Sequence, residues 1–157
     1  MLRPRDVRPS PLPRRDIAAL QRLEQRGLPP APVLCSDTTV AMGRTLYGKP
    51  ADAADAARML RELSGQTHRV LTAVALQAGR RRLQELSDSR VQFAPMTRAD
   101  IAAYVATGEP MGKAGAYAVQ GRAAAHIARI AGSYTGIMGL PLFETARMLK
   151  AAGVRTG

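Results

Sequence analysis

The chain has 157 residues, of which 46% are apolar, and this length and composition predict one folded domain with a hydrophobic core. Its net charge of +11 favours an anionic partner, but only 4% of its residues are aromatic and none is Trp, so a nucleic-acid-binding surface that stacks bases is the weakest alternative. A single cysteine, Cys35, excludes an internal disulfide, and the sequence has no Cys/His cluster of the kind that binds zinc.

Proline and arginine distinguish the first 32 residues from the rest, since seven of the eleven prolines lie there. We expect an irregular segment over residues 1–32, with one short helix over residues 16–26, and a folded domain over residues 33–157. The sequence contains neither a signal peptide nor an apolar stretch long enough to span a membrane. It therefore predicts a cytoplasmic protein without a membrane partner.

The predicted elements between residues 33 and 93 are mostly strands, which are apolar or β-branched and bounded by glycine or polar residues. In chain order they are a short buried strand (33–36), a hairpin around Gly43 (39–47), an amphipathic helix (52–63), and two strands that pair through a turn at Gly79 (70–76 and 83–93). Three consecutive arginines, 80–82, fall at the tip of the second hairpin, where we expect them to be solvated.

Helices and strands alternate in the remaining part of the chain. In order, the predicted elements are a helix with a Thr97/Asp100 capping box that ends at Gly108, two strands (117–120 and 126–130), a loop (133–136), and a last helix from Pro141 to about residue 152. Because strands and helices are interleaved, the predicted class is α/β with a mixed sheet.

Three polar residues lie beside predicted strands. Asp37 follows an apolar strand, where a carboxylate can hold a divalent metal or orient a water. Lys49 lies in a Gly/Pro-bounded turn and can reach a phosphate, although the frame of a P-loop is absent. Gln120 follows a run of small residues and can read a base edge through its amide. From the local patterns alone, a structural role is the commoner alternative for each residue, as it is for His68 and His126.

Between residues 33 and 153 the chain carries a series of motifs in fixed order: S-D-T-T-V, Y-G-K-P, D-A-A-D-A-A-R-M-L, L-S-G-Q-T-H-R-V-L-T, Y-V-A-T-G-E-P, K-A-G-A-Y-A-V-Q-G and G-S-Y-T-G-I-M-G-L-P-L-F-E-T. In this series the chain resembles the Maf-like nucleoside triphosphate pyrophosphatases, also called septum-formation proteins. The resemblance implies a strongly curved mixed sheet with flanking helices, as in the Maf and inosine-triphosphatase-like proteins, and a cleft between two lobes.

The resemblance also implies an activity: hydrolysis of a nucleoside triphosphate to a nucleoside monophosphate and pyrophosphate, with Mg²⁺ or Mn²⁺ as cofactor. Asp37 matches the residue assigned as proton acceptor and is a candidate metal ligand, and Lys49 matches a phosphate-binding lysine. Thr38 and Gln120 match positions linked to base choice. Threonine at position 38 is similar to the branch that acts on dTTP and UTP, so these nucleotides and modified pyrimidine nucleotides are the expected substrates.

The chain departs from the family pattern near its N-terminus. Members usually open with a strand and S-x-S-P-R-R, whose serine and arginines bind the triphosphate, whereas residues 10–15 read S-P-L-P-R-R without a preceding apolar strand. Gly112 and Ala118 stand where many members have Asp and Gly. The alternative interpretation is therefore a truncated, catalytically impaired Maf-like protein that retains only nucleotide or partner binding. The sequence leaves the oligomeric state open, with a homodimer as one candidate.

Overall fold

The computed structural model of the chain describes residues 21–22, 25–27 and 30–156. The helix predicted over residues 16–26 lies mostly outside these residues. The elements in chain order are β1 (Val33–Met42), β2 (Thr45–Tyr47), α2 (Ala53–Leu63), β3 (Thr67–Ala78), β4 (Arg81–Phe93), α3 (Arg98–Ala106), the 3-10 turns η1 (Ala114–Ala116) and η2 (Arg122–His126), β5 (Ile127–Ala131), α4 (Tyr134–Met138) and α5 (Leu142–Ala151). In this part of the chain, no helix has the length and apolar character needed to cross a membrane.

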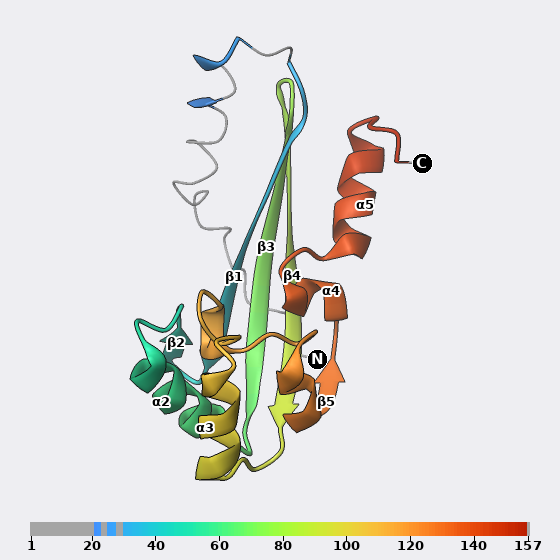
Figure 1. Ribbon diagram of the computed structural model, residues 1–157. Helices are drawn as coiled ribbons and strands as arrows, with labels where there is room; N and C mark the ends of the chain where they lie inside the picture. The colour runs from blue at the N-terminus through green and yellow to red at the C-terminus, as the bar shows by residue number, and fades with distance from the viewer. Residues whose placement is uncertain (1–20, 23–24, 28–29, 157) are drawn as a thin grey trace.

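The strands form one open sheet in the order β2-β1-β3-β4-β5 (Figure 1). Its helices and strands confirm the predicted α/β class, but every pairing among the described strands is antiparallel, so the prediction of a mixed sheet is wrong for this part of the chain. Tight turns at Gly43 and Gly79, both with positive φ, reverse the chain between β1 and β2 and between β3 and β4. Such short connections can join only antiparallel neighbours.

The helices pack against one face of this sheet. Alternate residues of β3 are buried from His68 to Leu76, while their neighbours are exposed or half-buried, as expected for a strand with one covered face. The main core lies at one end of the sheet, where side chains of β1, β3 and β4 pack with α2 and α3 (Figure 1). Nearer the tip of the β3–β4 hairpin, Met148 of α5 packs on Val74 and Leu76 in a second, smaller core. The long hairpin therefore carries two clusters of helices along one face.

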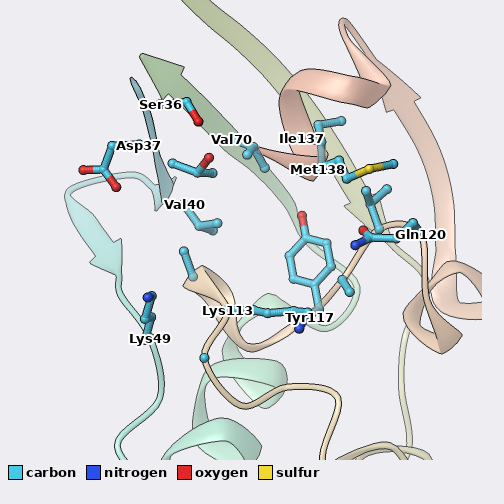
Figure 2. A pocket seen from close by; sticks show the side chains of 15 residues that line it. Ser36, Asp37, Val40, Lys49, Val70, Lys113, Tyr117, Gln120, Ile137 and Met138 are labelled. Carbon is cyan, nitrogen blue, oxygen red and sulfur yellow. The ribbon is translucent and has the colours of Figure 1, made fainter. Parts of the chain in front are cut away.

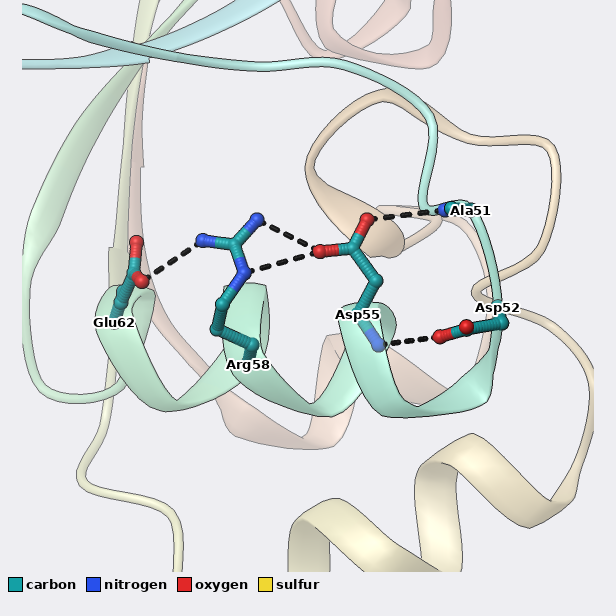
Figure 3. Close-up of polar contacts among 5 residues, drawn as sticks. All are labelled: Ala51, Asp52, Asp55, Arg58 and Glu62. Carbon is teal, nitrogen blue, oxygen red and sulfur yellow. Dashed lines mark hydrogen bonds and ion pairs between the residues drawn. The ribbon is translucent and has the colours of Figure 1, made fainter.

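The start of α2 is fixed by a network of polar contacts (Figure 3). Asp52 caps the helix by accepting a hydrogen bond of 2.8 Å from the backbone N–H of Asp55. The Asp55 carboxylate accepts from the backbone N–H of Ala51 at 3.0 Å and pairs with Arg58, and these contacts lower its pKa, the backbone bond most. Arg58 also pairs with Glu62 one turn later. The network holds the chain two residues after Lys49 and so anchors one side of the turn that carries this lysine.

The C-terminal half confirms the predicted capping box, the strand predicted over residues 126–130 (β5) and the predicted last helix (α5), and it corrects two other predictions. The Thr97 hydroxyl and the Asp100 carboxylate form the predicted capping box at the start of α3. Residues 117–120, predicted to be a strand, have no strand pairing. Residues 133–136, predicted to be a loop, instead begin a short helix, α4, because the Ser133 hydroxyl accepts a hydrogen bond of 2.9 Å from the N–H of Gly136. Residues 117–120 line the pocket described next, and the end of α4 also contributes to its lining.

Candidate active site

A pocket of about 300 Å³ opens between β1, the turn after β2, the segment around η1 and α4. The structure brings all four predicted site residues to it: Asp37, Thr38, Lys49 and Gln120. Figure 2 shows Asp37 and Lys49 on one side and Gln120 and Met138 on the other, with the ring of Tyr117 between them. The pocket therefore has a charged end and an amide-bearing end.

Strand pairing explains where the β1 side chains point. Asp37 and Thr38 pair with Ala73 and Thr72 of β3, and successive side chains of a strand point to opposite faces of the sheet. Thr38 is half-buried on the face covered by helices, whereas Asp37 is exposed and its carboxylate points outward at the pocket rim (Figure 2). The carboxylate is thus open to solvent and to a ligand that extends beyond the pocket.

Lys49 lies in a turn that is tied to the other side of the pocket. The backbone N–H of Gly115 donates to the carbonyl of Gly48 at 3.1 Å. Gly115 has a φ of +74°, and a Cβ at this position would lie 3.0 Å from a methyl carbon of Val40, so a larger residue would strain the backbone and crowd β1. Ala116 also has a positive φ, 61°, a conformation that is uncommon for a residue other than glycine. This tight crossing fixes the distance between Lys49 and the segment that follows.

Side chains of α3 and of the turn after it hold the segment that carries Gln120. The Tyr104 hydroxyl accepts a hydrogen bond of 3.2 Å from the backbone N–H of Ala118, and the Glu109 carboxylate accepts one of 3.1 Å from the N–H of Arg122. A Cβ at Gly121 would overlap the Glu109 carboxylate, so only glycine fits there without a shift. The backbone of this segment therefore bonds to side chains rather than to a neighbouring strand, which is why the strand prediction failed.

Tyr117 forms the wall between the two ends of the pocket. Its hydroxyl lies 2.7 Å from Nε2 of His68, and the rings of both residues pack against Phe93. Burial lowers the pKa of His68 from 6.5 to about 4, so this histidine is neutral near pH 7, and burial also raises the pKa of Tyr117. The prediction that His68 is structural agrees with this contact, because the imidazole supports the Tyr117 ring and is 1% exposed.

Helix α4 reaches the pocket because small residues let it approach β4 closely. A Cβ at Gly136 would overlap the Ser87 hydroxyl, and one at Gly132 would crowd Ser89. The Ser89 hydroxyl also accepts a hydrogen bond of 2.9 Å from the N–H of Ser133, the N-cap of α4. This packing brings Ile137 and Met138, which follow Gly136, into the pocket wall.

Lys113 and Tyr117 are two further polar residues of the pocket, and neither was predicted to have a role, although both lie in the K-A-G-A-Y motif. The signal that could have found Lys113 was its place in a run of glycine and alanine, since a lysine in a turn of small residues can face a ligand. With Lys113, two ammonium groups line the pocket against the single carboxylate of Asp37. The described lining is therefore net positive and favours an anionic ligand.

The described residues fit a divalent cation only in one way. Nowhere in the described part do three His, Cys, Asp or Glu side chains lie close enough together to hold a metal ion by themselves. Asp37 offers one carboxylate, and the hydroxyls of Ser36 and Thr38, which also line the pocket, offer neutral oxygens. Mg²⁺ is commonly bound by one or two carboxylates together with oxygens of substrate phosphates. The lining therefore fits a divalent cation only where phosphate oxygens of a ligand complete its coordination, and Asp37 would then be the carboxylate on the protein side.

Comparison with known proteins identifies the family. The family model for Maf-like protein matches residues 12–152. A dTTP/UTP pyrophosphatase from Polaromonas sp. (strain JS666 / ATCC BAA-500) is 70% identical over 138 residues, which are 88% of this chain and 68% of that protein. The dTTP/UTP pyrophosphatases of Albidiferax ferrireducens and Cupriavidus metallidurans are 67% and 61% identical, over 88% and 87% of this chain and 69% and 68% of their own lengths. The chain belongs to the Maf-like protein family.

Proposed function

We propose that the chain hydrolyses dTTP and UTP, and modified pyrimidine nucleotides, to the nucleoside monophosphate and pyrophosphate. The observation that carries this proposal is the polarity of one pocket, which has Asp37 and Lys49 at one end and Gln120 at the other (Figure 2). A nucleotide has the same polarity, with an anionic triphosphate at one end and a base with hydrogen-bonding edges at the other. The names of the relatives, at 61 to 70% identity, supply the substrate class.

At the charged end, Asp37 acts as the proton acceptor. It takes a proton from the water that attacks the triphosphate, the anhydride bond between the α- and β-phosphates breaks, and pyrophosphate leaves. Lys49 and Lys113, which line the same pocket, offset the negative charge that grows on the leaving pyrophosphate. The exposed position of Asp37 at the rim supports this role because water reaches it directly.

We also propose Mg²⁺ or Mn²⁺ as cofactor, bound by Asp37 together with phosphate oxygens of the substrate. Such a cation neutralises charge on the triphosphate. The support is the chemistry of the lining, which contains one carboxylate and the hydroxyls of other residues, with no second acidic side chain in the described pocket. Removal of divalent cations with EDTA should abolish pyrophosphate release, and added Mg²⁺ should restore it.

At the other end, Thr38 and Gln120 contribute to base choice. The Gln120 amide carries both a donor and an acceptor, so it can pair with the O4 or N3–H edge of uracil and thymine. Its segment is held by hydrogen bonds to Tyr104 and Glu109, which limits the orientations that its backbone can take. A wrong base would leave this amide without a hydrogen-bond partner, which disfavours binding of that base.

The test is pyrophosphate release from a panel of nucleoside triphosphates with Mg²⁺ or Mn²⁺. Asp37→Asn keeps the size of the side chain but removes the proton acceptor, and we expect kcat to fall by roughly a hundredfold or more. The matched control is Asp88→Asn, which removes an exposed carboxylate that pairs with Arg69 outside the pocket. Equal activity of Asp37→Asn and Asp88→Asn on dTTP would overturn the assignment of Asp37.

A chain that binds nucleotides without turnover is the second candidate, because no arginine lines the described pocket. Arginine forks are strong ligands of phosphate, and two lysines bind a triphosphate less specifically. Calorimetry with dTTP separates the two candidates: binding without pyrophosphate release supports a binding protein, whereas binding with turnover supports the enzyme. The cytoplasmic location and the homodimer remain predictions, testable by cell fractionation and by analytical ultracentrifugation.

A further inference from the structure

Two threonines on neighbouring strands connect the pocket to helix α4. Thr38 of β1 and Thr72 of β3 are direct partners in the strand register. Their Oγ1 atoms lie 2.9 Å apart, and Oγ1 of Thr72 lies 2.6 Å from the backbone carbonyl oxygen of Gly136. Thr72 is fully buried and does not line the pocket, whereas Thr38 is half-buried and does. The three groups therefore form a chain of hydrogen bonds that runs from α4 to the ligand side.

The direction of these hydrogen bonds follows from the number of protons that each group can donate. A carbonyl oxygen can only accept, so the Thr72 hydroxyl must give its single proton to Gly136. In the contact between the two threonines, Thr72 can then only accept, and Thr38 must be the donor. The Thr38 hydroxyl thus has its proton directed into the protein, and it presents only lone pairs to the pocket.

We infer that Thr72 is a positioning residue for base choice, because it holds Thr38 as a pure hydrogen-bond acceptor that selects the N3–H of uracil or thymine. Cytosine carries a lone pair at N3, which faces the lone pairs of Thr38 without a proton between them. This inference rests on the proposed function, since it takes a pyrimidine triphosphate as the ligand.

The position of Thr38 supports contact with the base. Gly139 closes α4 directly after Met138, which lies at the amide-bearing end of the pocket (Figure 2). A Cβ at Gly139 would lie 3.8 Å from Oγ1 of Thr38, so the lack of a side chain there keeps space open beside this hydroxyl. Thr38 therefore lies next to the pocket end at which Gln120 is also found.

The test compares kcat/KM for dTTP and dCTP in the wild-type chain and in Thr72→Val. Valine keeps the shape of threonine but cannot accept from Thr38, whose hydroxyl is then free to turn and donate to N3 of cytosine. We expect the ratio of kcat/KM for dTTP to kcat/KM for dCTP to fall by roughly tenfold, which is the effect of losing one hydrogen bond. Thr72→Ser retains the hydroxyl and should restore the wild-type ratio. A ratio unchanged in folded Thr72→Val, or lowered equally in Thr72→Ser, would overturn the inference.

A double-mutant cycle shows whether Thr72 acts through Thr38. In a Thr38→Val background, Thr72→Val should leave the ratio unchanged, because the acceptor is already gone, and a further tenfold fall would contradict the inference. If Thr72→Val does not fold, Thr72→Cys takes its place, since a thiol is a weak hydrogen-bonding group.

Binding separates failure of the inference from failure of the proposed function. A wild-type chain that releases no pyrophosphate contradicts the proposed function. In that case the ratio of the Kd values for dCTP and dTTP, measured by calorimetry, replaces the ratio of kcat/KM values. A wild-type preference for dTTP that is lost in Thr72→Val and kept in Thr72→Ser supports the inference even without turnover. Equal Kd values in the wild-type chain, or no binding of either nucleotide, overturn it.

Discussion

The Tyr104 hydroxyl donates a hydrogen bond of 2.8 Å to the Glu109 carboxylate, and together these two side chains hold the segment that presents Gln120. The same hydroxyl accepts from the N–H of Ala118, and the same carboxylate accepts from the N–H of Arg122. Burial and the neighbouring Glu109 both raise the pKa of Tyr104, so the phenol stays protonated and able to donate. Two side chains thus take over the backbone bonding that a strand would otherwise provide.

Loss of the Tyr104 hydroxyl should therefore affect both stability and substrate binding. In Tyr104→Phe, the N–H of Ala118 and one oxygen of Glu109 lose their partner, and we expect a loss of about 1 to 3 kcal/mol in the free energy of unfolding. The KM for dTTP should rise as the Gln120 segment loosens. Urea unfolding and steady-state kinetics measure the two effects. Tyr134→Phe, at a tyrosine that is 45% exposed, is the control and should change neither; equal behaviour of the two variants would contradict the role of Tyr104.

Elements whose signals are local could be predicted from the sequence. The turn at Gly79 joins β3 and β4 as expected, because glycine with positive φ and flanking β-rich runs specify a hairpin without help from the rest of the chain. The Thr97/Asp100 capping box likewise needs only residues three positions apart. Asp37, Thr38, Lys49 and Gln120 were found through motif order, and the structure brings them to one pocket, while their individual roles remain predictions.

Elements that depend on distant partners could not be predicted. Residues 117–120 have the composition of a strand, but their conformation depends on Tyr104, which lies 14 residues from Ala118. The same holds for α4: glycine is a poor helix former, and α4 forms where Gly136 packs on Ser87 of another element. The chain of hydrogen bonds through Thr72 joins residues 64 positions apart, and no short motif reports it.

The close packing of α4 gives a test of this dependence. Gly136→Ala would improve helix propensity by up to about 1 kcal/mol, but its Cβ would overlap the Ser87 hydroxyl. We expect the overlap to dominate, with a net loss of about 1 to 3 kcal/mol, and the displaced Met138 should raise the KM for dTTP. Ser87→Ala removes the overlapping hydroxyl, so the double variant should recover part of both losses. Wild-type stability and KM in Gly136→Ala would show that α4 is not held by this contact.

Lys113 provides a test of the positive charge of the pocket. It lines the pocket and is half-buried, whereas Lys150 lies exposed on α5 outside the pocket. Lys113→Ala should weaken binding of dTTP by roughly tenfold, the loss of one charge-assisted contact, and should weaken binding of thymidine far less. Lys150→Ala is the matched control for the change in net charge. Calorimetry with both ligands measures the difference, and an equal loss in the two variants would mean that Lys113 acts only through long-range charge.

His68 should make the stability of the chain depend on pH. Burial lowers its pKa to about 4 from the ordinary value of 6.5, so between these values the unfolded chain binds a proton that the folded chain does not. Its contribution, at most about 3 kcal/mol, is therefore present above pH 6.5 and is lost as the pH falls towards 4. In His68→Gln this part of the pH dependence of the free energy of unfolding should disappear. Urea unfolding from pH 4 to 7 measures the slopes, and equal slopes in wild-type and His68→Gln chains would mean that His68 takes up its proton without unfolding.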